Sequence, residues 1–173
     1  ALATQTSGKV AVIGIDLNKF KMINDQMGHN VGDMVLIELA GRLTEQLQQG
    51  ELVARIGGDE FTAIKRYADI SEVHEFLTRL NVALNEPMVI GDLKVSPGAS
   101  VGVALFPQDG TGTEVLLANS DLAMYRAKNS ISQKVCFYDG AMDEMARDRA
   151  KLAKDLWEGV ENKQFRLHYQ VQK

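Results

Sequence analysis

A glycine pair followed directly by two carboxylates, Gly57-Gly58-Asp59-Glu60, constrains this chain more than any other stretch. It lies between two apolar, strand-like runs at 52–56 and 61–64, and a two-residue Gly-Gly link between such runs predicts a β-hairpin. Glycine suits the turn because primed turns need positive φ, and its bare backbone lets a ligand approach closely. Side chains alternate between the faces of a strand, so we expect only one of Asp59 and Glu60 to point into a site there. The residues alone leave open which one, and a merely solvated turn is the simplest alternative.

The composition is that of one globular domain, because 45% of the 173 residues are hydrophobic and 24% are charged. The net charge of −4 argues against a nucleic-acid partner, which needs clustered Lys and Arg. The single cysteine, Cys136, lies in an apolar run and is expected to be a buried structural thiol. No apolar stretch reaches the roughly 18 residues that span a bilayer. We therefore expect no membrane contact within this segment and a cytoplasmic location, although a longer protein can be membrane-anchored through other segments.

Hydrophobic periodicity predicts alternating strands and helices. The run 9–15 indicates a buried central strand that ends at Asp16, and 99–106 indicates a second buried strand. Helical spacing predicts helices at 18–27, 30–47, 68–85 and 113–128, with N-caps at Asn18, Ser71 and Thr113. A small hairpin is expected around Gly91-Asp92 and a last strand at 134–138. Two hairpins among alternating elements predict an α/β fold with a mixed-direction central β-sheet flanked by helices.

The domain organisation follows from a change in composition after Gly140. We expect one domain over residues 1–140. Residues 143–159 are highly charged and carry a helical apolar stripe, which predicts a C-terminal connecting helix. A strand-like run at 165–169 follows, so residues 141–173 are interpreted as a linker helix and the start of a further domain.

Two carboxylates at strand ends, Asp16 and one of Asp59 and Glu60, stand beside a glycine turn. Mg²⁺ prefers such hard oxygen ligands and commonly binds one or two carboxylates together with substrate phosphates. Lys21 and Lys128 are candidates for holding those phosphates, although each lysine taken singly also fits a solvated helix position. The pattern predicts metal-dependent phosphoryl chemistry.

Four ordered blocks of the chain resemble the GGDEF family of diguanylate cyclases. They are Asp16-Leu17-Asn18-Lys19-Phe20-Lys21-Met22-Ile23-Asn24-Asp25 with Gly28-His29 and Gly32-Asp33, then Gly57-Gly58-Asp59-Glu60-Phe61, then 99–104, then 121–128. The resemblance covers about residues 9–139. It implies a nucleotidyl-cyclase-like fold and the condensation of two GTP molecules into cyclic di-GMP, with release of two pyrophosphates. Each domain would hold one GTP, so a two-fold product implies a homodimer of domains.

The resemblance also implies roles for individual residues. Mg²⁺ or Mn²⁺ would be held by Asp16, the carbonyl of Leu17, and Asp59. The matching catalytic positions are Asp59 as base for the 3′-hydroxyl, Glu60 as second acidic position, and Lys21 as transition-state stabiliser. The matching substrate-binding positions are Asn24 and Asp33 at the guanine edge, His29 beside the nucleotide, Gly57 and Gly58 at the turn, and Lys128 at the phosphates. An Asn and an Asp suit guanine because a carboxylate can accept from N1–H and the exocyclic amine.

Three departures from the family pattern bear on function. Asn18 stands where a second Asp is frequent. The inhibitory product site of many members is Arg-x-x-Asp, and the chain has Gln48 and Glu51 at those positions, so product inhibition there is not expected. Ile131-Ser132-Gln133 replaces a usual Gly-Arg-Asn turn.

The tail Leu167-His168-Tyr169-Gln170 resembles the opening of EAL phosphodiesterase domains and predicts an EAL domain in the same chain. Three functions therefore compete. The first is an active cyclase. The second is a non-catalytic GTP-binding module that regulates an adjoining EAL phosphodiesterase. The third is a dimerisation platform with a dead site, which would have no need of the metal and guanine residues.

Overall fold

The computed structural model describes residues 8–141, 152, 156–164 and 166. The described residues up to Tyr138 form one compact unit and those from Asp139 belong to a second, and each is treated by itself. The first unit contains all the predicted catalytic, substrate and metal positions.

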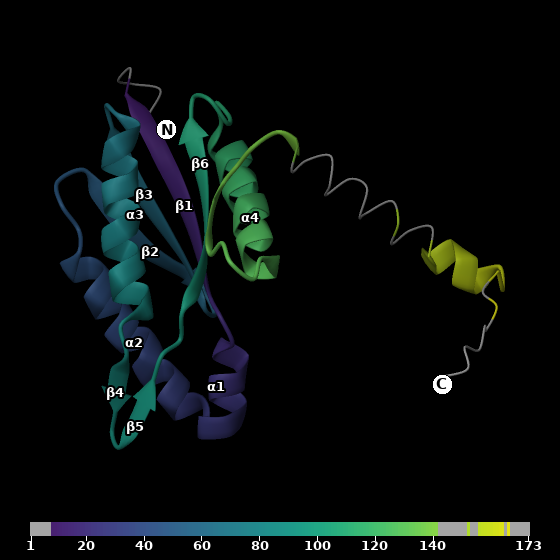
Figure 1. Ribbon diagram of the computed structural model, residues 1–173, viewed down its shortest axis with the longest axis horizontal. Coiled ribbons are helices and arrows are strands. Elements are labelled where there is room, and N and C mark those ends of the chain that lie inside the picture. Colours follow the sequence, from purple (N-terminus) through teal and green to yellow (C-terminus); the bar gives the residue numbers. More distant parts are fainter. Residues whose placement is uncertain (1–7, 142–151, 153–155, 165, 167–173) are drawn as a thin grey trace. The chain divides into compact units, whose positions relative to one another are not determined.

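A five-stranded sheet forms the centre of the first unit (Figure 1), with strand order β2-β3-β1-β6-β7. The bounds are β1 Lys9–Leu17, β2 Glu51–Gly57, β3 Glu60–Tyr67, β6 Ala99–Phe106 and β7 Val135–Phe137. β1 pairs antiparallel with both β3 and β6, whereas β7 runs parallel to β6. The predicted mixed-direction sheet is confirmed, with the first strand at its centre.

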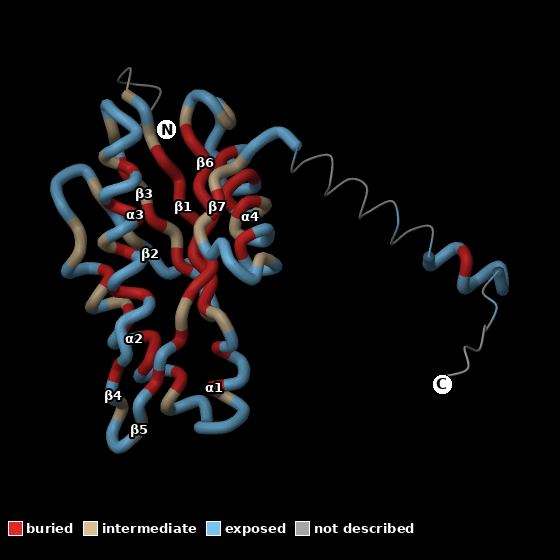
Figure 2. The backbone as a smooth tube through the Cα atoms, viewed as in Figure 1, coloured by how far each residue is buried: buried red, intermediate tan, exposed pale blue. Residues whose placement is uncertain are grey.

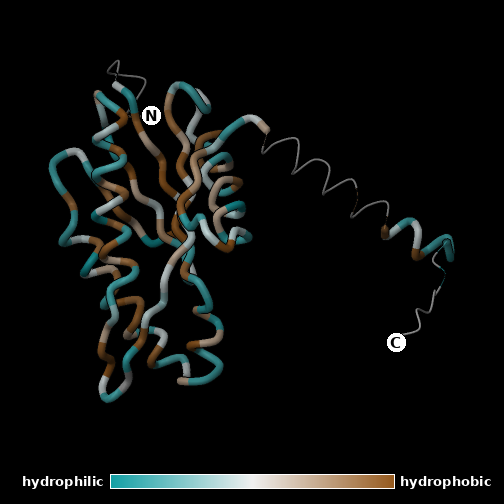
Figure 3. The backbone as a smooth tube through the Cα atoms, viewed as in Figure 1, coloured by the Kyte–Doolittle hydropathy of each residue, from teal (hydrophilic) through white to brown (hydrophobic). Residues whose placement is uncertain are grey.

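Helices cover both faces of this sheet. α1 (Phe20–Met27), α2 (His29–Glu45) and α3 (Ile70–Asn85) lie apart from α4 (Thr113–Asn129), which packs on the other side of β1 and β6 (Figure 1). Successive residues of β1 point to opposite faces of the sheet and join different cores. Ile13 packs in the large cluster with α2 and α3, and Val12 packs in a smaller cluster with Leu116 of α4. Both faces of β1 and β6 are therefore buried (Figure 2) and apolar (Figure 3), which explains their unbroken hydrophobic sequences.

Gly102 lets α4 lie close to the sheet. A Cβ atom at this position of β6 would overlap the backbone of α4 at Ser120 and Met124. Glycine is needed here for close approach rather than for an unusual φ. The tight contact brings the C-terminal turn of α4, with Lys128, toward the end of β1.

A second, two-stranded sheet is formed by β4 (Met88–Ile90) and β5 (Leu93–Val95), which pair antiparallel. Gly91 in the turn has φ 60°, as the predicted hairpin requires. Cys136 is buried in β7, and burial raises the pKa of its thiol. Both predictions are confirmed.

The predicted helix caps are wrong at three sites. α1 begins after Lys19, which adopts φ 60°, while the Asn18 side chain instead accepts a hydrogen bond from Ser100 Oγ at 2.8 Å. α3 is capped by Asp69, whose side chain accepts from Ser71 N in a capping box with Glu72. Gly112 precedes α4 and no side chain caps it. At α1 a tertiary partner, Ser100, takes the side chain that was expected to cap. At α3 the cap is a local capping box formed by Asp69 and Glu72, a pattern that the prediction missed.

The described part of the second unit is helical at 156–161. This agrees with the predicted connecting helix at 156–159 and extends it by two residues, whereas most of 143–155 lies outside the described residues. The predicted strand at 165–169 and the Leu167-His168-Tyr169-Gln170 stretch also lie outside them, except Arg166. Among the helices that the structure describes, none has the length and apolar character required to cross a membrane.

Candidate active site

The turn of the β2–β3 hairpin consists of Gly58 and Asp59, one residue later than predicted. The register shifts between Arg55 and Gly57, so that Gly57 pairs with Glu60. This bulge extends β2 and moves the link from Gly57-Gly58 to Gly58-Asp59. Only Gly58 has positive φ (50°), and its carbonyl accepts a hydrogen bond from Arg55 Nε at 2.9 Å.

Asp59 therefore lies in the turn and not in a strand, and strand alternation does not decide between it and Glu60. The backbone carbonyl of Asp59 accepts a hydrogen bond from Leu17 N at 3.2 Å, which joins the turn to the end of β1. The structure thus brings together Leu17 and Asp59, two of the three residues predicted to hold a metal.

Glu60, Asp16 and Ser100 form a row across three neighbouring strands. Asp16 of β1 pairs with Glu60 of β3 on one side and with Ser100 of β6 on the other. Residues directly opposite in antiparallel strands place their side chains on the same face, here the face covered by α4. The chain therefore places two carboxylates side by side at the end of the sheet.

Lys128, in the last turn of α4, pairs with Asp16 of this row. Its Nζ donates to both oxygens of Asp16, at 2.7 and 2.9 Å. Asp16 is buried, with 6% of its surface exposed, whereas half of the Lys128 side chain is exposed. The hydrogen bond to Asp16 raises the pKa of Lys128 against the effect of burial, and the charges of Asp59 and Glu60 raise it further. All three predicted carboxylates thus act on one ammonium group.

A cavity of about 600 Å³ opens between this row and α4. Its lining residues are Asp16, Glu60, Ala118, Asp121, Leu122, Met124, Tyr125 and Lys128. Its volume lies in the range of small-molecule sites, about 300–1,000 Å³. Of the predicted site residues, three line it: Asp16 and Glu60 from the sheet and Lys128 from α4.

Asp121 and Tyr125 line this cavity but were not among the predicted site residues. Partial burial raises the pKa of the Asp121 carboxyl. Residues three and four apart share a helix face, so Asp121, Tyr125 and Lys128 follow one stripe of α4. That spacing was the available signal in the sequence.

The remaining predicted residues lie on the two helices that follow β1. Lys21 and Asn24 belong to α1, whereas His29 and Asp33 belong to the first turns of α2. Gly28, with φ 88°, is the single residue between the two helices. Lys21, His29 and Asp33 are exposed and Asn24 is half-buried. Within the described part of the chain, none of these four residues lines the Asp16 cavity.

The donor set fits a metal bound together with a nucleotide. Among the described residues, no group of three or more His, Cys, Asp or Glu side chains is arranged to hold a metal ion. Mg²⁺ needs only one or two carboxylates when substrate phosphates and water complete its shell. Asp16 already binds a cation through both oxygens, the ammonium of Lys128. Asp16, the Leu17 carbonyl and Asp59 would hold the metal.

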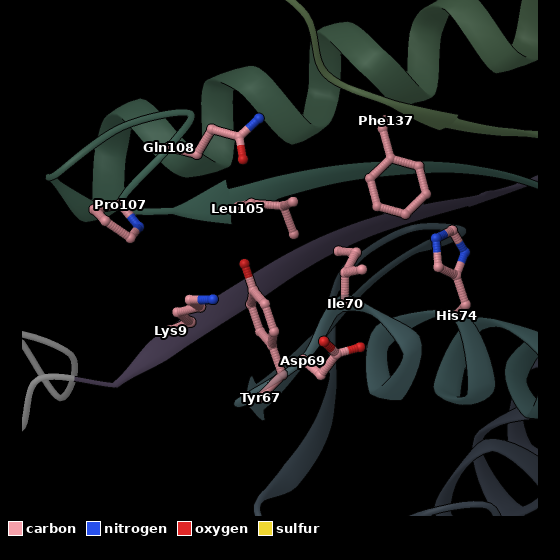
Figure 4. A pocket seen from close by; sticks show the side chains of 9 residues that line it. All are labelled: Lys9, Tyr67, Asp69, Ile70, His74, Leu105, Pro107, Gln108 and Phe137. Atoms are coloured by element: carbon pink, nitrogen blue, oxygen red, sulfur yellow. The ribbon is translucent and has the colours of Figure 1, made fainter.

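A second cavity of about 560 Å³ lies at the opposite end of β1, beside Lys9 and Tyr67 (Figure 4). The His74 and Phe137 rings lie 5.2 Å apart along it, and Leu105 forms part of its apolar floor. It contains none of the predicted site residues. The carboxylate end of the sheet is therefore the candidate active site.

Comparison with known proteins places this geometry in one family. The family model described as diguanylate cyclase, GGDEF domain, matches residues 1–134. The chain is 34% identical over 168 residues to the bifunctional diguanylate cyclase/cyclic di-GMP phosphodiesterase MucR of Pseudomonas aeruginosa, covering 97% of this chain and 24% of MucR. It is 32% identical over 164 residues to the cyclic di-GMP phosphodiesterase PdeR of Escherichia coli, covering 95% of this chain and 25% of PdeR. The chain thus spans about a quarter of the length of these curated relatives.

The solved structures agree with this placement. The crystal structure of the GGDEF domain of TpbB (YfiN) from Pseudomonas aeruginosa superimposes with a TM-score of 0.74 at 33% identity, over 79% of this chain and 86% of that chain. The chain therefore belongs to the GGDEF domain family, the diguanylate cyclase type of domain.

Proposed function

We propose that this chain condenses two GTP molecules into cyclic di-GMP, with release of two pyrophosphates, as a Mg²⁺-dependent dimer of domains. The observation that carries the proposal is the Lys128–Asp16 pair beside Glu60 in the cavity next to the Gly58-Asp59 turn. Carboxylates and an ammonium group at one sheet edge are what a metal-bound triphosphate requires. Names of relatives add support, since MucR is named as a diguanylate cyclase.

In the proposed reaction the 3′-hydroxyl oxygen of one GTP attacks the α-phosphorus of the other. The bond to the leaving pyrophosphate breaks, and the hydroxyl proton passes to the Asp59 carboxylate. Within the described residues, this carboxylate has no hydrogen-bond partner. Two such steps close the ring. A bound Mg²⁺ would neutralise charge on the leaving pyrophosphate and favour deprotonation of the hydroxyl.

The other residues bind and orient. Lys128 and Lys21 hold phosphates, and Asn24 and Asp33 hydrogen-bond the guanine edge. The site of one domain provides one GTP, so a second domain must face it to supply the other. A lone domain would bind GTP without forming product.

The test is cyclic di-GMP formation from GTP at high protein concentration, with Mg²⁺ or with EDTA. Asp59→Ala is expected to abolish product. Asp92→Ala is the matched control, because Asp92 follows Gly91 in the β4–β5 turn as Asp59 follows Gly58, far from the proposed chemistry along the chain. Product that survives Asp59→Ala or EDTA would refute the proposal.

A second candidate is a GTP-binding module that lacks catalysis and regulates an adjoining EAL phosphodiesterase. PdeR, a relative named only as a phosphodiesterase, and the Ile131-Ser132-Gln133 turn after α4 favour it. GTP binding without any product, in this chain and in a longer chain containing the EAL-like continuation, would establish this candidate over the first.

A further inference from the structure

Gly32, near the start of α2, lies against the side chains of Asn24 and Phe20 in α1. A Cβ atom built there would overlap Oδ1 of Asn24, with Asn24 Cγ at 3.0 Å and Phe20 Cζ at 3.2 Å. Gly32 is buried and its φ is not in the left-handed region, so backbone conformation does not demand glycine. Glycine is needed at this position because it leaves space for the Asn24 side chain.

The Asn24 amide is held by packing alone. Within the described part of the chain its side chain neither donates nor accepts a hydrogen bond, although the residue is half-buried. No described protein group therefore competes with a ligand for the hydrogen bonds of the amide. The amide lies against the Cα atom of Gly32, in the space that a Cβ atom would otherwise fill.

We propose that Gly32 is a positioning residue for Asn24 and thereby sets the purine selectivity of the site. The inference rests on the proposed function, in which Asn24 and Asp33 read the guanine edge. Asp33 follows Gly32 directly in α2. The same helical turn therefore positions both the Asn24 amide, which packs against Gly32, and the Asp33 carboxylate. Any displacement of the amide relative to Asp33 changes which base edge the pair matches.

Gly32→Ala is expected to displace the Asn24 amide from its position against residue 32, because the added methyl group would overlap Oδ1. Affinity for the guanine nucleotide should fall about tenfold, the scale of one lost hydrogen bond in a half-buried site. Affinity for the adenine nucleotide should hardly change, because adenine does not use the same contacts. The guanine-to-adenine ratio therefore falls, which a general loss of folded protein would not produce.

The same helix offers a matched control. Gly41 also lies in α2, and a Cβ atom there would meet nothing within 4 Å. Gly41→Ala should raise the thermal midpoint, since Ala favours helix over Gly, and should leave both affinities unchanged. Gly32→Ala should show no such gain.

The experiment is calorimetric titration of the whole chain with α,β-methylene analogues of GTP and ATP, which cannot release pyrophosphate. Wild type, Gly32→Ala, Gly41→Ala, Asn24→Ala and the double variant Asn24→Ala/Gly32→Ala are compared, together with their thermal midpoints. In the Asn24→Ala background, Gly32→Ala is expected to have no effect on either affinity, because the amide that it displaces is gone.

Two results would overturn the inference alone: an unchanged guanine-to-adenine ratio in Gly32→Ala, or an equal loss of affinity with and without Asn24. A wild-type chain that binds neither analogue would overturn the proposed function and this inference with it. In that case the thermal midpoints of Gly32→Ala and Gly41→Ala would still report whether the close packing at Gly32 is real.

Discussion

The Nζ atom of Lys128 lies 2.7 and 2.9 Å from the two carboxylate oxygens of Asp16, a residue 112 positions earlier in the chain. The contact joins the last turn of α4 to the end of the central strand. Asp16 is buried, so its charge needs a partner that the sheet itself does not supply. Lys128 thus has two tasks, to compensate Asp16 and, in the proposed function, to hold a phosphate.

Lys128→Met should lower the free energy of unfolding by about 1 kcal/mol, because it leaves a buried carboxylate without its cation while solvent screens the half-exposed side. Urea unfolding at pH 7 measures this. Lys94→Met, at an exposed position of β5, should change stability by less than about 0.5 kcal/mol. Equal midpoints for the two variants would show that the ion pair contributes nothing to stability.

Glu51 should make folding stability depend on pH. Its side chain is fully buried at the start of β2 and pairs with Arg79 at 2.6 and 2.7 Å and with Lys65 at 2.8 Å. Burial raises the pKa of this carboxyl, but hydrogen bonds from Lys65, Arg79 and the Gln48 backbone outweigh it, and the net pKa lies below 4.5. The stabilisation is therefore complete above pH 4.5 and is lost as the pH falls through the lower, folded value.

Glu51→Gln tests this directly. It should cost about 3 kcal/mol at pH 7, because it leaves two largely buried cations without a counter-charge. The variant should also lose less stability than wild type between neutral pH and pH 3, as followed by denaturant unfolding at each pH. Parallel pH profiles of the two proteins would contradict the assignment.

Cyclic di-GMP should not inhibit the chain through the turn between α2 and β2. Gln48 lacks a guanidinium, and the Glu51 carboxylate is already occupied by Arg79 and Lys65. Initial rates with and without added product measure this. Inhibition that disappears in a Gln48→Ala variant would show that the turn does bind product.

Product formation should rise with the square of protein concentration in dilute solution, because each domain holds one GTP and two domains must meet. Rates measured over a hundredfold dilution series test this, and light scattering over the same range reports the oligomeric state. A rate that stays proportional to concentration in a monomeric sample would mean that one domain suffices.

The glycines show which structural features a local sequence pattern can predict and which it cannot. The hairpin, the β4–β5 turn and the break between α1 and α2 were all predictable from Gly58, Gly91 and Gly28, because positive φ is a local requirement. Gly32 and Gly102 carry no such local signal. Their role is to admit a neighbour, Asn24 in one case and the α4 backbone in the other. The neighbour is defined only by the folded chain.

The sequence by itself determined the order of strands and helices, the mixed-direction sheet and the family, because hydrophobic period, turn glycines and the Gly57-Gly58-Asp59-Glu60 signature are local properties. Tertiary structure decided the contact of Asn18 with Ser100 in place of a helix cap, the one-residue shift of the turn, and the meeting of Asp16, Glu60 and Lys128 around one cavity. These depend on register and on contacts between residues far apart in the chain. A pattern of neighbouring residues does not encode such contacts, whereas packing α4 against β1 and β6 settles them at once.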